Sequence, residues 1–350
     1  MAGVFTSDSA EKLPMSARIL ALVAFVAFTS VSLAAQQGSA PGASTGRVVK
    51  PRILTHVVAD VNKSVAFYRQ GLNLEVVSGP APLTDSVLVH KARAKSPKAT
   101  ATSVTMAIPG SNLQLQFVQF TGIEGKPFTQ RLYDPGVTRF SIQVRDIDKA
   151  FNQVKDLGVT VDTTSAGPVF TQRPRNNTRA VMMRDPDGFV FEFVQAGTLP
   201  ETDVPASSNI YNARSSLALD NMEKAIAFYR DLLGFAVMNQ PGDINDAVLA
   251  LEGTPRARAR SVASMPPGSN NMWVLWEFRE LERTRHAPEV QDPGASVVAF
   301  DVENLPALVA RLKAAGVVIE TPGGDLVTLA GGHRAALIRS PDGMLIELVE

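Results

Sequence analysis

The segment DPDGFVFEF (Asp185–Phe193) decides the fold, because it returns near the end of the chain as SPDGMLIEL (Ser340–Leu348). The upstream segment SVAFYR (Ser64–Arg69) likewise returns as AIAFYR (Ala225–Arg230). Both pairs of copies are separated by nearly the same number of residues. A near-constant offset indicates a duplicated unit with small changes in loop length.

The repeated segment also assigns faces to its side chains. Asp185–Gly188 is a turn sequence, because Pro fixes one backbone dihedral and Gly tolerates a positive φ. In the strand that follows, alternation places the three Phe residues on one face and Glu192 on the other. The same parity places Glu347 opposite the apolar residues of the second copy. Both acids are therefore expected on the face away from the apolar core.

Four segments share one order of predicted elements: a strand, a helix and further strands. The first predicts a strand over Ile53–Ala59 and a helix over Asn62–Gln70, with Val65, Ala66 and Phe67 on its core side. Asn73 closes this helix in the left-handed conformation, and Gly234 takes its place in the duplicate. The other clear predictions are strands over Phe140–Val144 and Val297–Val302, and helices over Ile147–Leu157 and Leu305–Ala315.

The first fifty residues are expected to lie outside the fold. An apolar run, Ile19–Ala27, follows Arg18 and leads to the small residues Ala34 and Ala35, which is the pattern of a cleaved secretory signal. The alternative is an uncleaved membrane anchor. We predict a signal peptide over 1–35, a disordered tether over 36–50, and a secreted or periplasmic protein without stable membrane insertion after cleavage.

Composition limits the function. The 34 basic and 34 acidic residues balance without a basic tract, which argues against nucleic acid as a partner. The chain has no Cys, so a thiolate metal site and a cysteine nucleophile are excluded. A small-molecule ligand is expected, and the sequence does not indicate an oligomeric state. The remaining length predicts two domains, 51–196 and 210–350, joined by a linker over 197–209.

The repeated Phe-Tyr-Arg helix ends and Pro-Asp-Gly-x-x-x-Glu hairpins resemble the vicinal oxygen chelate superfamily, which holds glyoxalase I, extradiol dioxygenases, and bleomycin and fosfomycin resistance proteins. The resemblance covers the chain from about residue 51 to its end. It implies an α+β fold with four βαβββ modules, paired within each half into two glyoxalase-like domains with curled, cup-shaped mixed sheets. It does not specify the reaction, because a fold alone does not define a function.

Metal-using members take a His or similar ligand from the first strand of a module and a Glu from its last strand. Carried over by motif spacing, the first-strand positions are Ile53, Arg139, Arg214 and Val297. The last-strand positions are Gln116, Glu192, Glu277 as the nearest candidate in the third module, and Glu347. No first-strand position holds a metal ligand, so we predict no metal and no cofactor, although the family implies a divalent metal.

The histidines do not replace the missing ligands. His56 is expected on the helix-packed face of its strand, because it lies an odd number of residues from the ligand position. His90 and His286 fall in charged, loop-like stretches and are expected at the surface. His333 precedes a strand and is expected near the mouth of a cup.

An Arg and a Glu stand where the family would hold metal. We expect Arg139 with Glu192 in one cup and Arg214 with Glu347 in the other. Each pair is either a buried ion pair that fills a former metal site, or an anion anchor with a general base. Gln116 and Glu277 are further candidate binding residues, and Glu192 and Glu347 the candidate catalytic ones.

The combined expectation is an exported glyoxalase/bleomycin-resistance-like protein that binds a small anionic or aromatic molecule, without metal. The alternatives are a metal-dependent lyase, isomerase or dioxygenase of the glyoxalase type with an atypical metal site, and an interaction scaffold with filled cups. Whether the protein is an enzyme stays open at this point.

Overall fold

The computed structural model describes residues 45–350, apart from 128–129 and 172–176. The predicted signal peptide lies outside these residues. The first strand begins at Arg47, so the last four residues of the predicted tether belong to the fold. They do so because Val48 is buried in the core of the second half. None of the helices in the described part is long and apolar enough to cross a membrane.

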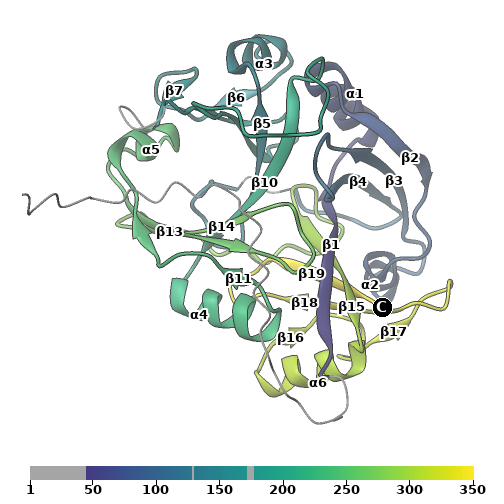
Figure 1. Cartoon of the computed structure of the whole chain (residues 1–350). Helices are drawn as coiled ribbons and strands as arrows, with labels where there is room; N and C mark the ends of the chain where they lie inside the picture. The colour runs from purple at the N-terminus through teal and green to yellow at the C-terminus, as the bar shows by residue number, and fades with distance from the viewer. Residues whose placement is uncertain (1–44, 128–129, 172–176) are drawn as a thin grey trace, which may run out of the picture. The chain divides into compact units, whose positions relative to one another are not determined.

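Four modules follow one another along the chain (Figure 1). The first contains β1 (Arg47–Val57), α1 (Val61–Leu72), β2 (Glu75–Pro82), α2 (Val87–Lys95), β3 (Thr100–Ala107) and β4 (Gln114–Thr121). The second contains β5 (Thr138–Val144), α3 (Ile147–Val154), β6 (Thr160–Val161), β7 (Val169–Phe170), β8 (Arg179–Arg184) and β9 (Val190–Gln195).

The third and fourth modules repeat this order, with a π-helical segment, η1, continuing the first helix of the third. The third contains β10 (Ile210–Leu219), α4 (Met222–Ile226), η1 (Ala227–Leu232), β11 (Ala236–Val237), β12 (Gly242–Asp243), α5 (Asp246–Leu251), β13 (Arg258–Met265) and β14 (Trp273–Arg279). The fourth contains β15 (Ser296–Glu303), α6 (Leu305–Ala314), β16 (Val318–Ile319), β17 (Val327–Thr328), β18 (Arg334–Arg339) and β19 (Leu345–Val349).

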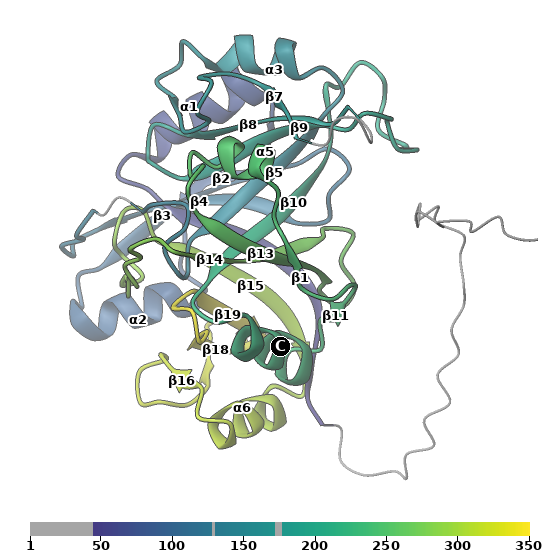
Figure 2. The ribbon, with the colours of Figure 1, turned by 90° about the vertical axis from the view of Figure 1, so that its left-hand side faces the viewer.

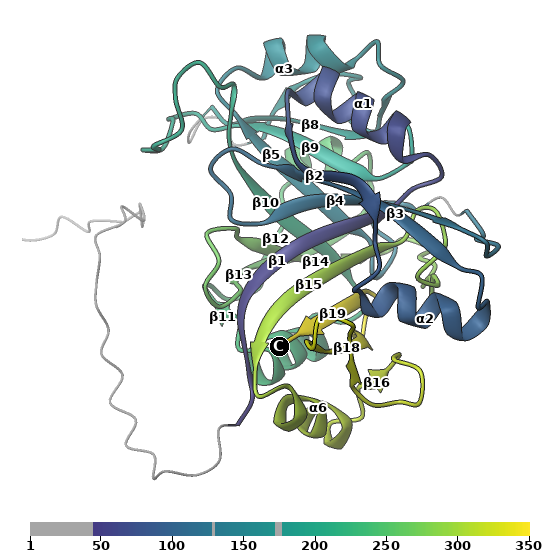
Figure 3. The ribbon, with the colours of Figure 1, turned by 90° about the vertical axis from the view of Figure 1, so that its right-hand side faces the viewer.

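The modules pair across the two halves of the chain. Sheet A joins the first and fourth modules in the order β16-β18-β19-β15-β1-β4-β3-β2, and sheet B joins the second and third in the order β11-β13-β14-β10-β5-β9-β8-β6. The two junctions are the antiparallel pairs β1–β15 and β5–β10. Figure 3 shows β1 and β15 running side by side. The prediction that each half pairs its own two modules into one sheet is therefore wrong.

The two largest hydrophobic cores, in contrast, stay within the halves, whereas two smaller clusters join modules of different halves. One core joins the helices and strands of the first two modules and the other joins those of the last two, with few exceptions. Helices α1 and α3 lie together at one end of the described part, and α4 and α6 lie at the opposite end, with the strands between them (Figures 1 and 2). Each half thus shares a core, whereas each sheet is shared between halves.

The repeated motifs contact one another in the first half. The hydroxyl group of Tyr68, at the end of α1, donates a hydrogen bond of 2.9 Å to the carboxylate of Asp185 in the turn before β9. Asp185 also accepts bonds from the backbone N–H groups of Asp187 and Phe189, which holds the turn. The helix-end motif and the turn motif are therefore two sides of one contact.

Several local predictions are confirmed. Asn73 ends α1 with φ 54° and Gly234 has φ 77°, both left-handed. The three Phe residues of β9 and the turn before it lie in the core of the first half, and Glu192 lies on the other face. Of the three residues predicted on the core side of α1, Phe67 is buried and Val65 packs against the core, whereas Ala66 is exposed. Ser64 and Tyr68 are buried as well.

Candidate functional site

The central strands of sheet B bring an Arg, a Ser and a Glu into one row. Arg214 on β10 is paired with Ser141 on β5, and Ser141 is paired with Glu192 on β9. Residues paired across neighbouring strands point to the same face of a sheet. All three line a cavity of about 460 Å³ on the concave face, which we call the sheet-B cup. The cup joins Glu192 with Arg214, from different halves of the chain.

A second row on the same face holds Val274, Ser216 and Arg139. This row has no Glu at its far end, because Val274 on β14 stands at the position that matches Glu192 in the first row. Arg139 instead forms an ion pair with Glu252, which follows the covering helix α5. The side chains of this pair are only 2% and 1% exposed. The guanidinium carbon of Arg139 also lies 4.4 Å from the ring centre of Trp276, a cation–π contact.

The predicted pairing of Arg139 with Glu192 is therefore corrected. Both residues belong to sheet B and influence each other electrostatically, but the ion-pair partner of Arg139 is Glu252. Glu252 had no signal in the sequence, because α5 is short and belongs to another module. Ser141 could have been predicted from the sequence, because it lies two residues after Arg139 on an alternating strand and therefore points to the same face of the sheet.

Glu192 is the titratable group at the centre of the cup. Burial raises its pKa to about 7, and the nearby carboxylate of Glu252 acts in the same direction. The hydroxyl group of Ser141, 2.5 Å from Oε2 of Glu192, and the charges of Arg139 and Arg214 oppose this rise. The carboxyl group of Glu192 can therefore take up or release a proton near neutral pH.

Arg214 is the cation of the cup that has no partner. Among the residues that the structure describes, it makes no hydrogen bond and no ion pair, and its side chain is exposed. Its pKa is lowered because the walls of the cup limit its hydration, while Tyr211 and Glu192 act against this. A free guanidinium in a concave site is suited to bind a carboxylate or phosphate through two hydrogen bonds.

Two further donors line the cup without partners. Gln143 is 3% exposed, and its amide nitrogen has no acceptor within the described residues. The indole N–H of Trp276 is buried and likewise without an acceptor in that part of the chain. Both residues line the cavity. Buried donors normally have acceptors, so Gln143 and Trp276 are suited to donate hydrogen bonds to a ligand in the cup.

The concave face of sheet A is built on the same plan but is closed. Glu347 is paired with Ala299, and Ala299 with Ile53, so Ile53 stands where sheet B has Arg214. The carboxylate of Glu347 accepts hydrogen bonds from the hydroxyl group of Ser86 and the backbone N–H of Val87, at the start of α2. Burial raises its pKa, and these bonds oppose the rise.

Helix α2 covers this face. Its apolar side chains pack against β15, β18 and β19, and Lys91 forms a 2.9 Å ion pair with Glu320. A cavity of about 190 Å³ remains, lined by Arg52, Gln116, Glu347 and other residues. Arg214 and Glu347 lie on different sheets, so their predicted pairing is wrong. Gln116 and Glu347 do share one cup, and Gln116 accepts a hydrogen bond from Thr55.

Glu277 is not part of either cup. The register of β10 with β14 puts Val274 at the last-strand position of the third module. Glu277 lies on the opposite face, where it is buried beside Arg260 and Arg279 and forms ion pairs with both. The prediction of Glu277 as a cup residue is wrong, because no repeated turn precedes β14 from which the last-strand position could be counted.

The histidines largely follow their predictions. His56 is 2% exposed and stacks on Phe189 at 3.7 Å, and burial lowers its pKa to about 3. His90 is exposed, although it lies on α2 rather than in a loop. His286 is partly exposed and contacts Asp134. His333 lines the sheet-A cavity, as expected for the mouth of a cup.

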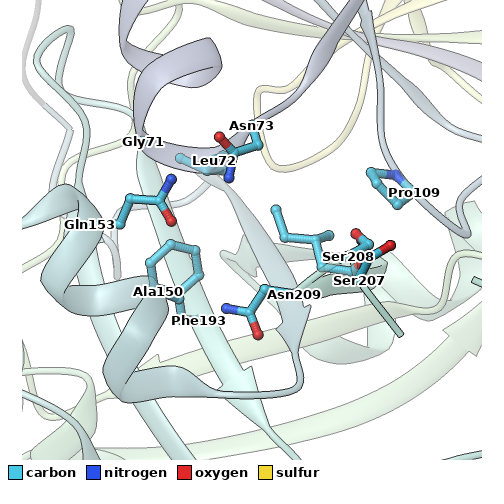
Figure 4. A pocket seen from close by; sticks show the side chains of 11 residues that line it. Gly71, Leu72, Asn73, Pro109, Ala150, Gln153, Phe193, Ser207, Ser208 and Asn209 are labelled. Carbon is cyan, nitrogen blue, oxygen red and sulfur yellow. Dashed lines mark hydrogen bonds between the residues drawn. The ribbon is translucent and has the colours of Figure 1, made fainter. Parts of the chain in front are cut away.

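A smaller cavity of about 100 Å³ lies away from both cups, between the end of α1, α3 and the connection to β10. Figure 4 shows Asn73, Gln153 and Asn209 around it. It contains no charged side chain. A larger cavity of about 610 Å³ is lined by Lys224, Asp231, Arg285 and other residues, none of them a predicted site residue. We treat the sheet-B cup as the candidate functional site, because it brings Arg214 and Glu192 together.

Comparison with known proteins supports the fold assignment. The profile of the Glyoxalase/Bleomycin resistance protein/Dioxygenase superfamily matches residues 53–193 and 213–348. The chain belongs to this superfamily. It is 28% identical to lactoylglutathione lyase GLX1 of Arabidopsis thaliana over 105 residues, which are 30% of this chain and 32% of that protein. The match thus spans about a third of the length of this curated relative.

The fold is also that of a known enzyme. The crystal structure of glyoxalase I from Zea mays matches with a TM-score of 0.56 and 17% sequence identity, over 87% of this chain and 92% of that chain. At this identity the likeness concerns the fold, which is the tandem, four-module form with mixed sheets.

The family implies a divalent metal, but the side chains of this chain do not fit one. The four positions in the sheet-B cup hold Arg139, Arg214, Glu192 and Val274, so Glu192 is the one anionic donor among these four, and the nearby Glu252 is paired with Arg139. The matching positions of the sheet-A cup hold Ile53, Val297, Gln116 and Glu347, of which Glu347 is the one anionic donor. Asp85 and His333 also line that cavity. Within the described residues, no group of three or more His, Cys, Asp or Glu side chains is arranged to hold a metal ion. A metal site needs several neutral or anionic donors.

Proposed function

We propose that this protein binds a small organic anion in the sheet-B cup, without metal, and that Arg214 anchors the anionic group. The observation that carries the proposal is the unpartnered guanidinium of Arg214 beside an Arg139–Glu252 pair that is already neutral. An anion bound there exchanges hydration for two charge-assisted hydrogen bonds. Gln143 and Trp276 supply further donors, and the indole ring supplies a flat wall for an aromatic ligand.

The sheet-A cup supports this choice by contrast. It keeps the Glu of the shared plan but replaces the Arg with Ile53, and α2 satisfies the carboxylate. We infer that the sheet-A cup is a structural, filled cup and that ligand binding is confined to sheet B. The protein thus combines a ligand-binding cup in sheet B with a filled cup in sheet A, which is the feature expected of an interaction scaffold.

Intrinsic fluorescence gives a direct test, because the chain has only two Trp residues and Trp276 lines the cup. Titration with benzoate should change the emission of Trp276 saturably, and replacing Trp273 with Phe isolates that signal. Arg214→Met should weaken benzoate binding at least tenfold, as the loss of one charge-assisted pair of bonds of about 1.5 to 3 kcal/mol implies. Arg52→Met, on the sheet-A cavity, is the matched control and should bind like the wild type.

Equal benzoate affinity in the Arg214→Met variant and the wild type would refute the proposed site. The metal-dependent alternative, a lyase, isomerase or dioxygenase of the glyoxalase type, is tested separately by elemental analysis of protein purified from its native host. A stoichiometric transition metal would overturn the metal-free proposal.

We also propose that the protein is exported and that residues 1–35 are removed. The support is the apolar run followed by small residues near Ala34. Mass spectrometry of the protein from its native host should give a mature N-terminus near Gln36. Recovery of the full-length chain only from membranes would favour the anchor alternative.

A further inference from the structure

We propose that the sheet-B cup binds its anion together with one proton, which is held on the carboxyl group of Glu192. The inference rests on the proposed function and specifies how the ligand is recognised. The anionic group is held by Arg214, and an oxygen of the ligand accepts a hydrogen bond from the protonated Glu192.

Glu192 and Arg214 stand in one row, separated by Ser141, so their Cα atoms are about 10 Å apart at the usual strand spacing. The two side chains form no ion pair with each other within the part of the chain that the structure describes. An anion on the guanidinium of Arg214 therefore lies in the space between the two groups, over Ser141.

The charge balance of the cup favours a protonated Glu192 when an anion is bound. Glu192 faces Arg139 and Ser141 from β5, Arg214 from β10, and Glu252 from the end of α5. The neighbouring residue of β8 is Met182, which carries no charge. Asp243 of β12, whose side chain is exposed, also lines the cup. With Glu192 ionised, the three acids Glu192, Glu252 and Asp243 outnumber the two Arg before any ligand arrives. With Glu192 protonated, two acids balance two Arg, and the cup no longer repels an anion.

Hydrogen bonding at Glu192 also favours its protonated form when an anion is bound. Ser141 donates to Oε2 of Glu192, and the other carboxyl oxygen has no partner among the described residues. An ionised carboxylate beside a bound anion would leave two acceptors facing each other, which is unfavourable. A protonated carboxyl group instead provides the donor that a ligand oxygen requires.

The electrostatic coupling is large enough to measure. An anion about 5 Å from Glu192 raises the affinity of this carboxyl group for a proton on the order of a hundredfold, at an effective dielectric constant near 20. Burial already brings the pKa of the free site to about 7. Ligand binding above neutral pH should therefore take up a proton from the solution.

The test is calorimetry of the whole mature protein with benzoate at pH 8, in HEPES and in Tris, whose ionisation enthalpies differ. The dependence of the observed enthalpy on the buffer should correspond to uptake of about one proton per benzoate. The uptake should fall toward zero at pH 5.5, where Glu192 is already protonated. The affinity should fall by up to about tenfold for each pH unit above the pKa of the free site, until the pKa of the complex is reached.

Glu192→Gln mimics the protonated group and supplies the decisive variant. It should bind benzoate with an affinity that does not change with pH between 6 and 8.5, and without proton uptake. Glu347→Gln, the matched acid of sheet A, should take up protons like the wild type. Binding at pH 8 without proton uptake, or uptake that persists in Glu192→Gln, would overturn the inference while leaving the anion site intact. If benzoate fails to bind at any pH, the proposed function fails, and the inference fails with it.

Discussion

Removal of Arg139 should destabilise the fold through Glu252 rather than through Glu192. Arg139→Met leaves the carboxylate of Glu252, whose side chain is 1% exposed, without its cation. Breaking a buried pair by removing one partner costs about 3 to 5 kcal/mol. Because burial raises the pKa of Glu252, the unpaired carboxyl group can be protonated at low pH. The loss should therefore be larger at pH 8 than at pH 5.

The double variants identify the partner. Arg139→Met with Glu252→Gln removes both charges and should recover most of the lost free energy of unfolding, because neutral replacement of a buried pair is often close to isoenergetic. Arg139→Met with Glu192→Gln should recover little. Urea denaturation of the wild type, the single variant and both doubles measures these differences. Recovery by Glu192→Gln, rather than by Glu252→Gln, would refute the assignment of this pair.

Three further outcomes are expected. The stability of the fold should fall as pH rises from about 4.5 to about 7. Burial raises the pKa of Glu192, Asp185 and Asp342 to about 7, so the folded chain holds more protons than the unfolded one in this range. Thermal melts across this range measure the effect, and a melting temperature that does not change with pH would contradict it. Tyr68→Phe should lower the free energy of unfolding by about 1 to 3 kcal/mol, and by more at pH 8 than at pH 6, because Asp185 loses a hydrogen bond that favours its ionised form. Chemical denaturation at both pH values measures the difference. Equal losses of stability at the two pH values would argue against this role of the bond. A fragment of residues 45–200 should associate or aggregate in size-exclusion chromatography, because β1 and β5 lose their antiparallel partners; a stable monomer would be inconsistent with the shared sheets.

Local sequence signals predicted the elements better than their pairing. Alternation in β9 placed Glu192 on the concave face, and Asn73 marked the end of α1, because both effects depend on neighbouring residues alone. The pairing of β1 with β15 was not predicted. Both β4 and β15 are apolar strands, and the local sequence of a strand does not indicate which other strand it pairs with.

The candidate site shows the same division. The positions of Arg139, Arg214 and Glu192 on their strands followed from motif spacing. The ion-pair partner of each Arg depends on how the modules pair and on α5, which places Glu252 beside Arg139. A long-range ion pair of this kind cannot be inferred from spacing within one module.

The antiparallel pair β1–β15 also has a consequence for synthesis of the chain. His56 is paired with Ser296, so the ribosome must add another 240 residues before β1 can pair with β15. At about 5 to 20 residues per second, this delay is roughly 12 to 48 s. Until then β1 has an open edge, which other chains can pair with. Contacts so distant in sequence also slow folding after release. A chain that is slow to complete either sheet stays accessible to chaperones and, if it is exported unfolded, to the translocation machinery.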